Sequence, residues 1–435
     1  MPPLDKIRRF SHPKLGIIMC VLTVYSVHPA VGDTLWDYLA RYPTSVDLMD
    51  IAPADHQFFV IGARSEFLRW ESDSTPPVET IVPPLQRNLL LVLNVDKREQ
   101  DLVWHREYAN LPDVHEVYST APTTDHQLCI VYGSDTRKET GINPLMVRLD
   151  RTGGSLWFKH VFPQDTDTDS EFVSGEHIAN LDAIKLTATA NNACLLALIT
   201  RSTQFEETFR LHLIRYGEQG EIVWHKVLPT NLYGKSHLLS AHPPWRHFVV
   251  QTNVSRDAAL QAMMRGQAFI PQINMIVLDS DGGVLPKIDL PNTLNDAWLY
   301  NAMATSPKSL LFVGKKGGPW LAHIHSDGHV ATEHFDNNKI ITSGAVTAIT
   351  ARGKRGYIIT HDGYISVLDP KLHLQSTEAI KDMVTKSYHN PQLALEHPEH
   401  LAVDKLLPLN TAHYLLFYQY GSQLVEVNLE KQRPK

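Results

Sequence analysis

The sequence has little cysteine and none of the common catalytic motifs. It holds three cysteines in 435 residues. Cys20 lies near the N-terminus, while Cys129 and Cys194 lie in apolar, strand-like runs, so we expect buried free thiols and no disulfide framework. The sequence contains no Gly-x-Ser-x-Gly elbow, phosphate-binding loop or His-Glu-x-x-His motif. It therefore lacks the local signatures of several enzyme classes.

Long apolar segments are also missing. The apolar run near the N-terminus, from Leu15 to Val27, is shorter than the roughly 20 residues that span a bilayer. Basic residues precede it and Ala30-Val31-Gly32 follows it, which is the pattern of a secretory signal peptide. We expect cleavage after Gly32, with an uncleaved anchor as the lesser alternative. The predicted mature chain, residues 33–435, is periplasmic or secreted and has no membrane span.

Excess positive charge is absent as well. The net charge is −7, and loss of residues 1–32 removes four basic residues and one acidic residue, which leaves −10. Nucleic acid carries a dense negative charge and is attracted by basic surfaces. Nucleic acid is therefore excluded as an expected partner.

The chain does contain a repeated sequence motif, the Asp-x-x-Gly-x-x-x-Trp phrase. Three copies are Leu149-Asp150-x-x-Gly153-x-x-x-Trp157, Tyr216-Gly217-x-x-Gly220-x-x-x-Trp224 and Leu278-Asp279-x-x-Gly282-x-x-x-Pro286. The Asp and Gly positions are typical of tight hairpin turns. A supersecondary unit repeated at this period, unable to bury its apolar face alone, indicates radially stacked sheets.

Seven strongly apolar runs give the number of repeats. Each run suits a strand buried on both faces between neighbouring sheets. They are 58–61, 128–131, 195–198, 247–250, 310–313, 357–360 and 414–417. We therefore predict an all-β fold, a seven-bladed β-propeller of four-stranded antiparallel blades that forms a single domain over residues 33–435.

Ring closure is predicted from the two ends of the mature chain. Few residues follow the last expected turn at Asn428, too few for an outer strand of the seventh blade. Residues 32–36, Gly-Asp-Thr-Leu-Trp, match the outer-strand phrase of the other repeats and place Trp36 in the tryptophan position. We expect this N-terminal strand to pair with the last blade and remove the free edges.

The Asp-x-x-Gly-x-x-x-Trp phrase resembles the tryptophan-bearing repeats of secreted bacterial propellers and, more distantly, of quinoprotein-like (tryptophan-docking) propellers. Its Asp-to-Trp spacing is one residue shorter than in the quinoprotein-like class. Only Trp157, Trp224, Trp104 and Trp36 fill the docking position. The resemblance implies a propeller with tryptophans packed between blades, and no quinone site is carried over.

The lengths of the connections between strands predict that the two ends of the ring differ. One end has short turns only, and the other, which we call the decorated face, has long loops. Turns after the first and third strands of each blade are short, whereas all long connections belong to the other end of the ring: 65–87, 133–143, 163–180, 229–237, 253–271 and 381–400. Long loops on a rigid scaffold are where binding usually resides. We single out Phe67, Leu68 and Trp70 in the first segment. In the fifth, a short expected helix over 257–269 carries Leu260, Met263 and Met264, which either bind a partner or seal the loop onto the ring.

One connection has the spacing of a calcium loop. Asp165, Asp167, Asp169 and Glu176 occupy relative positions 1, 3, 5 and 12, the spacing of carboxylates around Ca²⁺. Ser170 stands where such loops have glycine, so a solvated acidic loop is the alternative. No cofactor is required by the sequence, and calcium is the one candidate.

Histidine clusters are interpreted as scattered polar residues. His323 and His325 share one strand face near His329, and Glu396-His397-x-x-His400 lies between prolines that disfavour a helix.

We predict a monomeric, non-enzymatic scaffold that binds a protein partner through its decorated face, as an assembly factor, inhibitor or neutraliser. The alternative is a hydrolase or lyase acting on a glycan or peptide in the central funnel, which would require a His, a carboxylate and an Arg from several blades.

Overall fold

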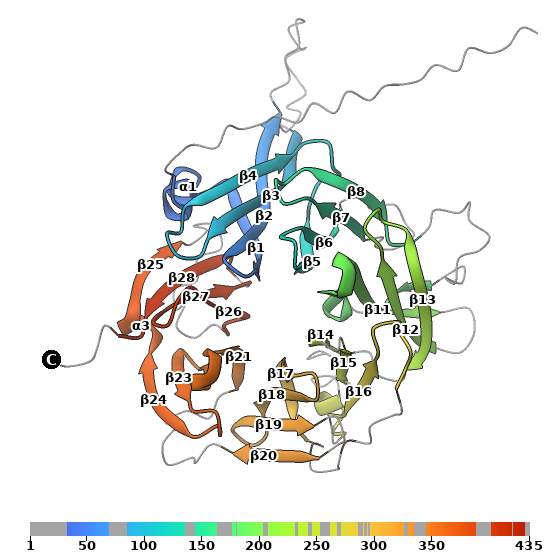
Figure 1. Cartoon of the computed structure of the whole chain (residues 1–435), viewed down its shortest axis with the longest axis vertical. Coiled ribbons are helices and arrows are strands. Elements are labelled where there is room, and N and C mark those ends of the chain that lie inside the picture. Colours follow the sequence, from blue (N-terminus) through green and yellow to red (C-terminus); the bar gives the residue numbers. More distant parts are fainter. Residues whose placement is uncertain are drawn as a thin grey trace, which may run out of the picture.

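The chain forms a ring of seven antiparallel sheets, seen down its axis in the computed structural model of Figure 1. The structure describes residues 33–68, 85–134, 144–162, 176–179, 181–202, 208–230, 234–241, 246–252, 262–267, 271–285, 290, 294, 296–325, 329–334, 345–388, 402–419 and 421–430. The predicted seven-bladed propeller is confirmed. The sheets are called blades 1 to 7 in chain order.

The strands of each blade are consecutive in the sequence. Blade 1 holds β1 (Val46–Pro53), β2 (Gln57–Leu68), β3 (Leu85–Asp96) and β4 (Leu102–Tyr108). Blade 2 holds β5 (Glu116–Pro122), β6 (Leu128–Gly133), β7 (Leu145–Leu149) and β8 (Ser155–His160). Blade 3 holds β9 (Glu176–Ile178), β10 (Lys185–Ala188), β11 (Cys194–Ser202), β12 (Thr208–Tyr216) and β13 (Ile222–Thr230), with 3-10 turns η1 (Leu181–Ala183) and η2 (Ala190–Asn192) beside β10.

The second half of the ring repeats this plan. Blade 4 holds β14 (Ser236–Ala241), β15 (Arg246–Thr252) and β16 (Ile273–Leu278). Blade 5 holds β17 (Trp298–Ser306), β18 (Ser309–Lys315), β19 (Pro319–His325) and β20 (Val330–His334). Blade 6 holds β21 (Val346–Ala351), β22 (Tyr357–His361), β23 (Tyr364–Leu368) and β24 (Leu374–Ala379), with η4 (Gly353–Arg355) between its first two strands. Blade 7 follows α3 (Ile380–Met383) and holds β25 (Val384–Tyr388), β26 (Lys405–Pro408), β27 (His413–Tyr418) and β28 (Gln423–Asn428).

The apolar core is divided among the junctions between blades. Seven buried clusters lie between neighbouring sheets, one at each junction. The seven predicted apolar runs all fall in the second strand of their blade, in β2, β6, β11, β15, β18, β22 and β27. Their side chains alternate between the two flanking clusters, as with Phe58 toward blade 7 and Phe59 toward blade 2. This two-sided burial explains why the runs are continuous and not alternating.

The predicted tryptophan packing is confirmed at three consecutive junctions. Trp104, Trp157 and Trp224 each lie against the turn glycine of the next blade, at Gly153, Gly220 and Gly282. These glycines have φ of +81°, +82° and +78°, a conformation that residues with a Cβ rarely adopt. The Trp104 and Trp157 Nε1 groups also donate to carbonyls of the next blade, at 2.9 and 3.0 Å. Each tryptophan therefore joins its blade to the next by packing and, in two cases, by a hydrogen bond.

The expectation of free thiols is wrong. Cys129 in β6 and Cys194 in β11 form a disulfide between blades 2 and 3, with Cα atoms 6.7 Å apart. Both lie in one buried cluster at this junction. An apolar run suits a thiol and a disulfide equally well, because both are buried hydrophobic groups. What the sequence does not give is that these two runs face each other across a blade junction.

The predicted N-terminal outer strand is also wrong. Residues Leu35–Arg41 form helix α1, and the outer strand of blade 7 is β25, which pairs with β28 in the sheet order β25-β28-β27-β26. Thr34 and Asp37 form a capping box, in which each side chain bonds to the other residue's backbone N–H. Such a box starts a helix. Leu35, Tyr38 and Leu39 are then buried on one helical face.

Helix α1 lies at the seam between the first and last blades (Figure 1). Its buried residues share one apolar cluster with β1, β2 and β3 of blade 1 and with β27 of blade 7. The Tyr388 hydroxyl of β25 donates to the Val46 carbonyl of β1 at 2.8 Å. The Trp36 Nε1 donates to Gln100 of blade 1 at 2.6 Å. Backbone hydrogen bonds, from the Leu35 N–H to the Gln100 carbonyl and from the Leu102 N–H to the Asp33 carbonyl at 2.9 Å each, also hold the start of α1 to blade 1. No strand is exchanged between blades 1 and 7 among the described residues.

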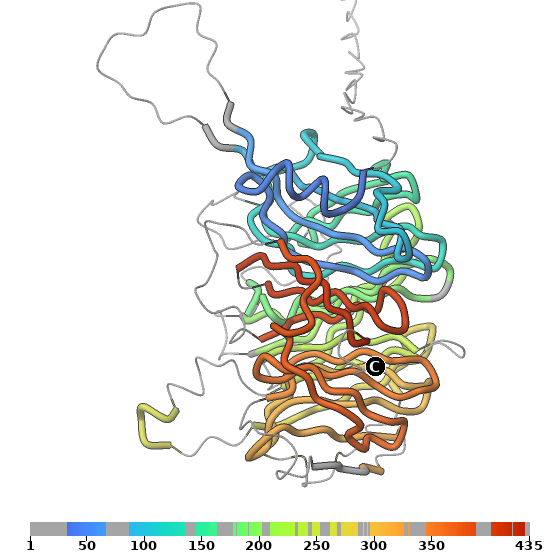
Figure 2. Tube along the Cα trace, turned by 90° about the vertical axis from the view of Figure 1, so that its left-hand side faces the viewer, coloured from blue at the N-terminus to red at the C-terminus, as the bar shows by residue number. Residues whose placement is uncertain are grey.

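The two ends of the ring differ among the described residues. Short turns such as Asp150–Gly154 occupy the right-hand side of Figure 2, where the Asp150 carboxylate accepts hydrogen bonds from the Thr152 and Gly154 N–H groups at 2.7 and 2.8 Å. Strands β2 and β3 and the segment 262–267 project on the opposite side. We call these the hairpin side and the loop side. No helix among the described residues is long and apolar enough to cross a membrane.

Candidate functional site

The innermost strand of each blade faces the ring axis. These strands are β1, β5, β10, β14, β17, β21 and β26 (Figure 1). Four of them carry a β-bulge near their start, after Leu48, Val117, Leu299 and Val346. A bulge kinks the strand and re-aims the next side chain. In three of these strands the residue at which pairing resumes after the bulge is polar: Asp50, Ser119 and Asn301.

Each of these polar side chains bonds to the next blade. Asp50 accepts from the Thr120 hydroxyl at 2.7 Å, and Ser119 accepts from the Leu186 N–H at 2.9 Å. Asn301 donates to the Thr347 carbonyl at 3.4 Å. At the seam, Lys405 of blade 7 lies 2.5 Å from the Asp50 carboxylate and donates to the Ile51 carbonyl at 3.2 Å. The axial wall is therefore cross-linked by polar contacts from blade to blade.

Further charged groups surround the start of these inner strands. Asp404 accepts a hydrogen bond from the Gln419 N–H at 2.8 Å, and burial raises the pKa of its carboxyl. Burial also raises the pKa of Glu116, with a further increase from Asp182. Lys185 and Lys235, beside β10 and β14, add positive charge, and burial, followed by Lys235 and Lys405, lowers the pKa of Lys185 to about 8.

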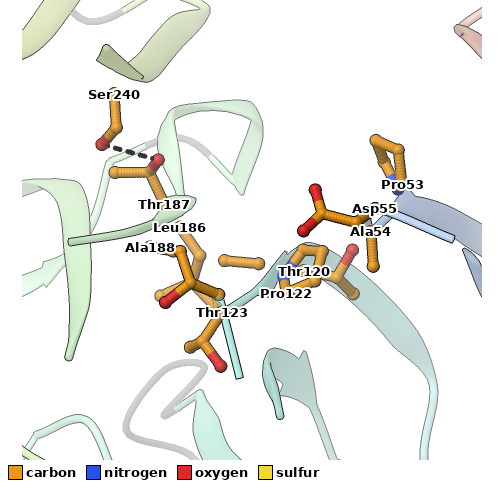
Figure 3. Close-up of a pocket in the computed structure, with 12 residues that line it drawn as sticks. Pro53, Ala54, Asp55, Thr120, Pro122, Thr123, Leu186, Thr187, Ala188 and Ser240 are labelled. Carbon is orange, nitrogen blue, oxygen red and sulfur yellow. Dashed lines mark hydrogen bonds between the residues drawn. The ribbon is translucent and has the colours of Figure 1, made fainter. Parts of the chain in front are cut away.

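A pocket of about 470 Å³ opens at the ring axis on the hairpin side (Figure 3). Turns of blades 1, 2 and 3 line it, with Ser240 of blade 4. Its polar groups are the Asp55 carboxylate and the hydroxyls of Thr120, Thr123, Thr124, Thr187 and Ser240. Thr187 donates to Ser240 at 2.9 Å, the bond drawn in Figure 3. This lining mixes hydrogen-bonding groups with the small apolar side chains of residues such as Ala54, Pro122 and Leu186.

The inner strands carry two of the three residue types that the hydrolase or lyase alternative requires, on blades in different parts of the ring. His237 of β14 and the carboxylate of Asp50 come from blades 4 and 1. The sequences of the seven inner strands contain no arginine, the third group that the hydrolase or lyase alternative requires. Lysines stand near the axis instead.

The predicted partner-binding residues fall into two groups. Phe67 and Leu68 form the end of β2, paired with Gln86 and Leu85 of β3. Trp70 and Leu260 lie outside the described residues. Met263 and Met264 lie in a short helical turn on the loop side and are 70% and 79% exposed. These two methionines therefore do not seal the connection onto the ring.

The predicted calcium loop falls mostly outside the described residues. Asp165, Asp167 and Asp169 are not among them, and Glu176 begins β9, where it pairs with Ser202 of β11. The part of the chain that the structure describes contains no group of three or more His, Cys, Asp or Glu residues placed to hold a metal ion. The calcium assignment stays a prediction.

The histidines of blade 5 lie close to one another. The ring centroids of His323 and His325 are 4.8 Å apart, and those of His325 and His329 are 5.9 Å apart. His323 Nε2 also lies 3.2 Å from the Thr305 hydroxyl. His397 and His400 are outside the described residues.

Other histidines are buried and uncharged. His212 is fully buried between the Thr200 hydroxyl at 2.9 Å and His225 at 3.0 Å. His247 is 1% exposed and lies 2.7 Å from the Ser240 hydroxyl. Burial lowers the pKa of His212 to about 3 and that of His247 to about 4, from an ordinary 6.5. Both side chains are neutral at pH 7.

These buried histidines predict acid sensitivity. Below pH 6.5 His247 is protonated in the unfolded chain, whereas in the folded protein it stays neutral until about pH 4. The free energy of unfolding therefore falls as the pH is lowered from 6.5 to 4. At about 1.4 kcal/mol per pKa unit, the expected loss is about 3 kcal/mol. Urea unfolding at pH 7 and pH 4 should show a smaller loss for His247→Gln than for wild type. The exposed His56→Gln is the control, and an equal loss in His247→Gln would contradict the assignment.

The charged groups near the axis were not predicted from the sequence. Lys185, Lys235, His237, Lys405 and Asp50 stand at or near the starts of inner strands from four blades. Their only sequence signal is a polar residue beside the first, weaker strand of each repeat. Such residues are common on strands, and their convergence appears only once the ring is assembled.

No protein-family model matches the sequence, and a comparison with curated proteins finds no match. Among solved structures, the chain is similar to YCF48 from Cyanidioschyzon merolae, with 10% identity over 89% of this chain and 97% of that one and a TM-score of 0.45. The propeller domain of the Trilobed protease from Pyrococcus furiosus gives 9% identity, 89% and 96% coverage and a TM-score of 0.44. The WD40 propeller domain of Doa1 is 8% identical over 90% of this chain and 95% of that one, with a TM-score of 0.42. These similarities concern the propeller fold and assign no activity to this chain.

Proposed function

We propose that this protein is a non-enzymatic propeller scaffold that binds a protein partner through its loop side, in the periplasm or outside the cell. The observation that carries the proposal is the exposure of Met263 and Met264, at 70% and 79%. Large apolar side chains exposed together are costly in water and mark contact surfaces. Methionine is flexible and polarisable, and it adapts to a partner's shape.

The ring supplies the rigid support that such a surface needs. Segment 262–267 belongs to the connection between β15 and β16, two strands paired over six residues from His247 to Thr252. Blade 4 is packed against blades 3 and 5 by two apolar clusters. A loop anchored on such a scaffold presents its side chains at a defined place.

The buried disulfide supports the proposed compartment. Cys129 and Cys194 are both fully buried, and disulfides persist in the periplasm and outside cells, whereas reducing systems keep cytosolic thiols reduced. This agrees with the signal peptide predicted for residues 1–32.

Negative charge at the two methionines is expected to weaken partner binding. Residues 33–435 would be used as bait in an extract of the secretory compartment, and the captured protein would be purified and its Kd measured. In Met263→Asp/Met264→Asp the Kd should rise at least tenfold, about 1.4 kcal/mol or more, because a carboxylate cannot enter an apolar contact without a large desolvation cost.

The matched control carries the same charges elsewhere. Leu156→Asp/Val223→Asp changes two exposed apolar residues, 46% and 50% exposed, on outer strands β8 and β13. Its Kd should stay within twofold of wild type. Binding that survives the methionine changes, or that is lost equally in the control, contradicts the proposed surface.

A further inference from the structure

The axial pocket on the hairpin side is lined by hydrogen-bond acceptors. Its polar side chains are five hydroxyl groups and the Asp55 carboxylate. A hydroxyl group has one O–H donor and two acceptor lone pairs. What the pocket offers to a ligand therefore depends on where each O–H is directed.

Four of the five hydroxyls belong to threonines, and each of the four donates to an oxygen atom of the protein itself. The bonds run from Thr120 to Asp50 at 2.7 Å, from Thr123 to Asp125, from Thr124 to Asn192 at 2.7 Å and from Thr187 to Ser240 at 2.9 Å. Asp50 is ionised beside Lys405, and an ionised carboxylate can only accept. Because these O–H groups are engaged, the four threonine hydroxyls have only lone pairs left for a ligand.

Asp55 supplies the charge of this lining. In Figure 3 its carboxylate points away from Pro53 and across the pocket, toward the side where Thr187 lies. Among the described residues no hydrogen bond or ion pair holds this carboxylate. Lys97 lies within electrostatic range but donates to the Asp55 main-chain carbonyl, at 2.9 Å. The two carboxylate oxygens are therefore open to a ligand.

A lining of acceptors selects a ligand that carries donors. A primary ammonium has three N–H donors and no acceptor, and its hydrogen bonds to a carboxylate are charge-assisted and strong. Ala54, Pro122 and Leu186 add apolar surface against which methylene groups can pack. The volume of about 470 Å³ is that of a small-molecule site. A metal ion needs a tight shell of ligands, and the part of the chain that the structure describes has no group of three or more His, Cys, Asp or Glu residues that could hold one.

We propose that the axial pocket binds a small organic cation, a primary ammonium on a short aliphatic chain, with its N–H groups bonded to Asp55 and to the threonine hydroxyl oxygens. The ammonium satisfies acceptors that the protein leaves open, and the chain lies on the apolar part of the lining. The pocket lies on the hairpin side, whereas Met263 and Met264 lie on the loop side. This site goes beyond the proposed partner binding and does not depend on it.

The test is a calorimetric titration of the protein with pentylammonium chloride at pH 7. Wild type should show saturable binding, and in Asp55→Asn the Kd should rise at least tenfold, because the amide keeps the shape of the side chain and loses its charge. The Tm of Asp55→Asn should equal that of wild type, since the carboxylate holds no described residue. Thr187→Val removes one acceptor and should raise the Kd about threefold. Thr187→Ser keeps the hydroxyl and should bind as wild type does.

Matched probes and a matched variant separate this site from general attraction of cations. Pentyltrimethylammonium has the charge and the chain but no N–H donor, and 1-pentanol has the chain but no charge, so both should bind at least tenfold more weakly. Asp281→Asn removes an exposed carboxylate in the turn after β16, outside the pocket lining, and should bind pentylammonium as wild type does. So should Met263→Asp/Met264→Asp, which keeps this result distinct from a failure of partner binding. Equal affinity for the trimethylated probe, an equal loss in Asp281→Asn, or no saturable binding overturns the proposal.

Discussion

Replacing Cys129 and Cys194 together by alanine should lower the free energy of unfolding by about 4 kcal/mol. The disulfide closes a loop with a sequence separation of 65 residues, and loss of that constraint from the unfolded chain accounts for this magnitude. Both cysteines are fully buried in the cluster between blades 2 and 3. Urea unfolding of oxidised wild type and of the variant, under non-reducing conditions, measures the difference.

A second comparison isolates the covalent bond from the side-chain change. Wild type unfolded in the presence of reductant should lose most of the same free energy, while the alanine variant should be indifferent to reductant. Thiol titration of the denatured, non-reduced mature protein should find no free cysteine. Two free thiols, or equal stability of oxidised and reduced wild type, would refute the bond.

The second large effect concerns the tryptophan at the junction of blades 2 and 3. Trp157→Ala should cost about 3 kcal/mol, because a large packed aromatic ring is removed together with its hydrogen bond to the Glu218 carbonyl at 3.0 Å. Gly220→Ala should also be strongly destabilising. Its added Cβ would lie 2.7 Å from the Trp157 ring, at a residue with φ of +82°.

A double-mutant cycle tests whether the two residues act together. In the Trp157→Ala background the Cβ clash is absent, so Gly220→Ala should cost only its backbone strain. Gly317→Ala gives the size of that strain alone, since Gly317 has φ of +69° and no atom within 4 Å of the added Cβ. If Gly220→Ala costs no more than Gly317→Ala in the wild-type background, the tryptophan contact is not the reason for this glycine.

The fold was predictable because its strongest signals are local. The second strands are continuous apolar runs, and the Asp-x-x-Gly turns need a positive φ at one fixed position, so both leave a mark within a few residues. Because these local signals recur at a regular period along the sequence, they also indicate sheets stacked in a ring. The error at the N-terminus arose because Gly32 to Trp36 matches the outer-strand phrase, although Thr34 and Asp37 also form a capping box. Burial of Leu35, Tyr38 and Leu39 against both end blades favours the helix.

The disulfide and the axial groups could not be predicted in the same way. Cys129 and Cys194 meet only because one face of β6 packs against one face of β11, which depends on the register of two sheets. Lys185, Lys235 and His237 come from two neighbouring inner strands and carry no shared motif. Non-local convergence of this kind has no period in the sequence. Met263 was singled out from the sequence as part of an apolar stripe, and its exposure of 70% in the structure could not be derived from the sequence.

The seam at α1 has an evolutionary consequence. Every sheet, the seventh included, is formed by strands that are consecutive in the sequence, with β25 to β28 running from Val384 to Asn428. A duplication or deletion with breakpoints between sheets would add or remove a whole blade and would leave no strand of another blade unpaired. In a propeller whose last blade is completed by a strand from the N-terminal end of the chain, the first and last blades must evolve as a pair. In the described part of the chain they are coupled through side chains such as Tyr388, and each can diverge by ordinary point substitution.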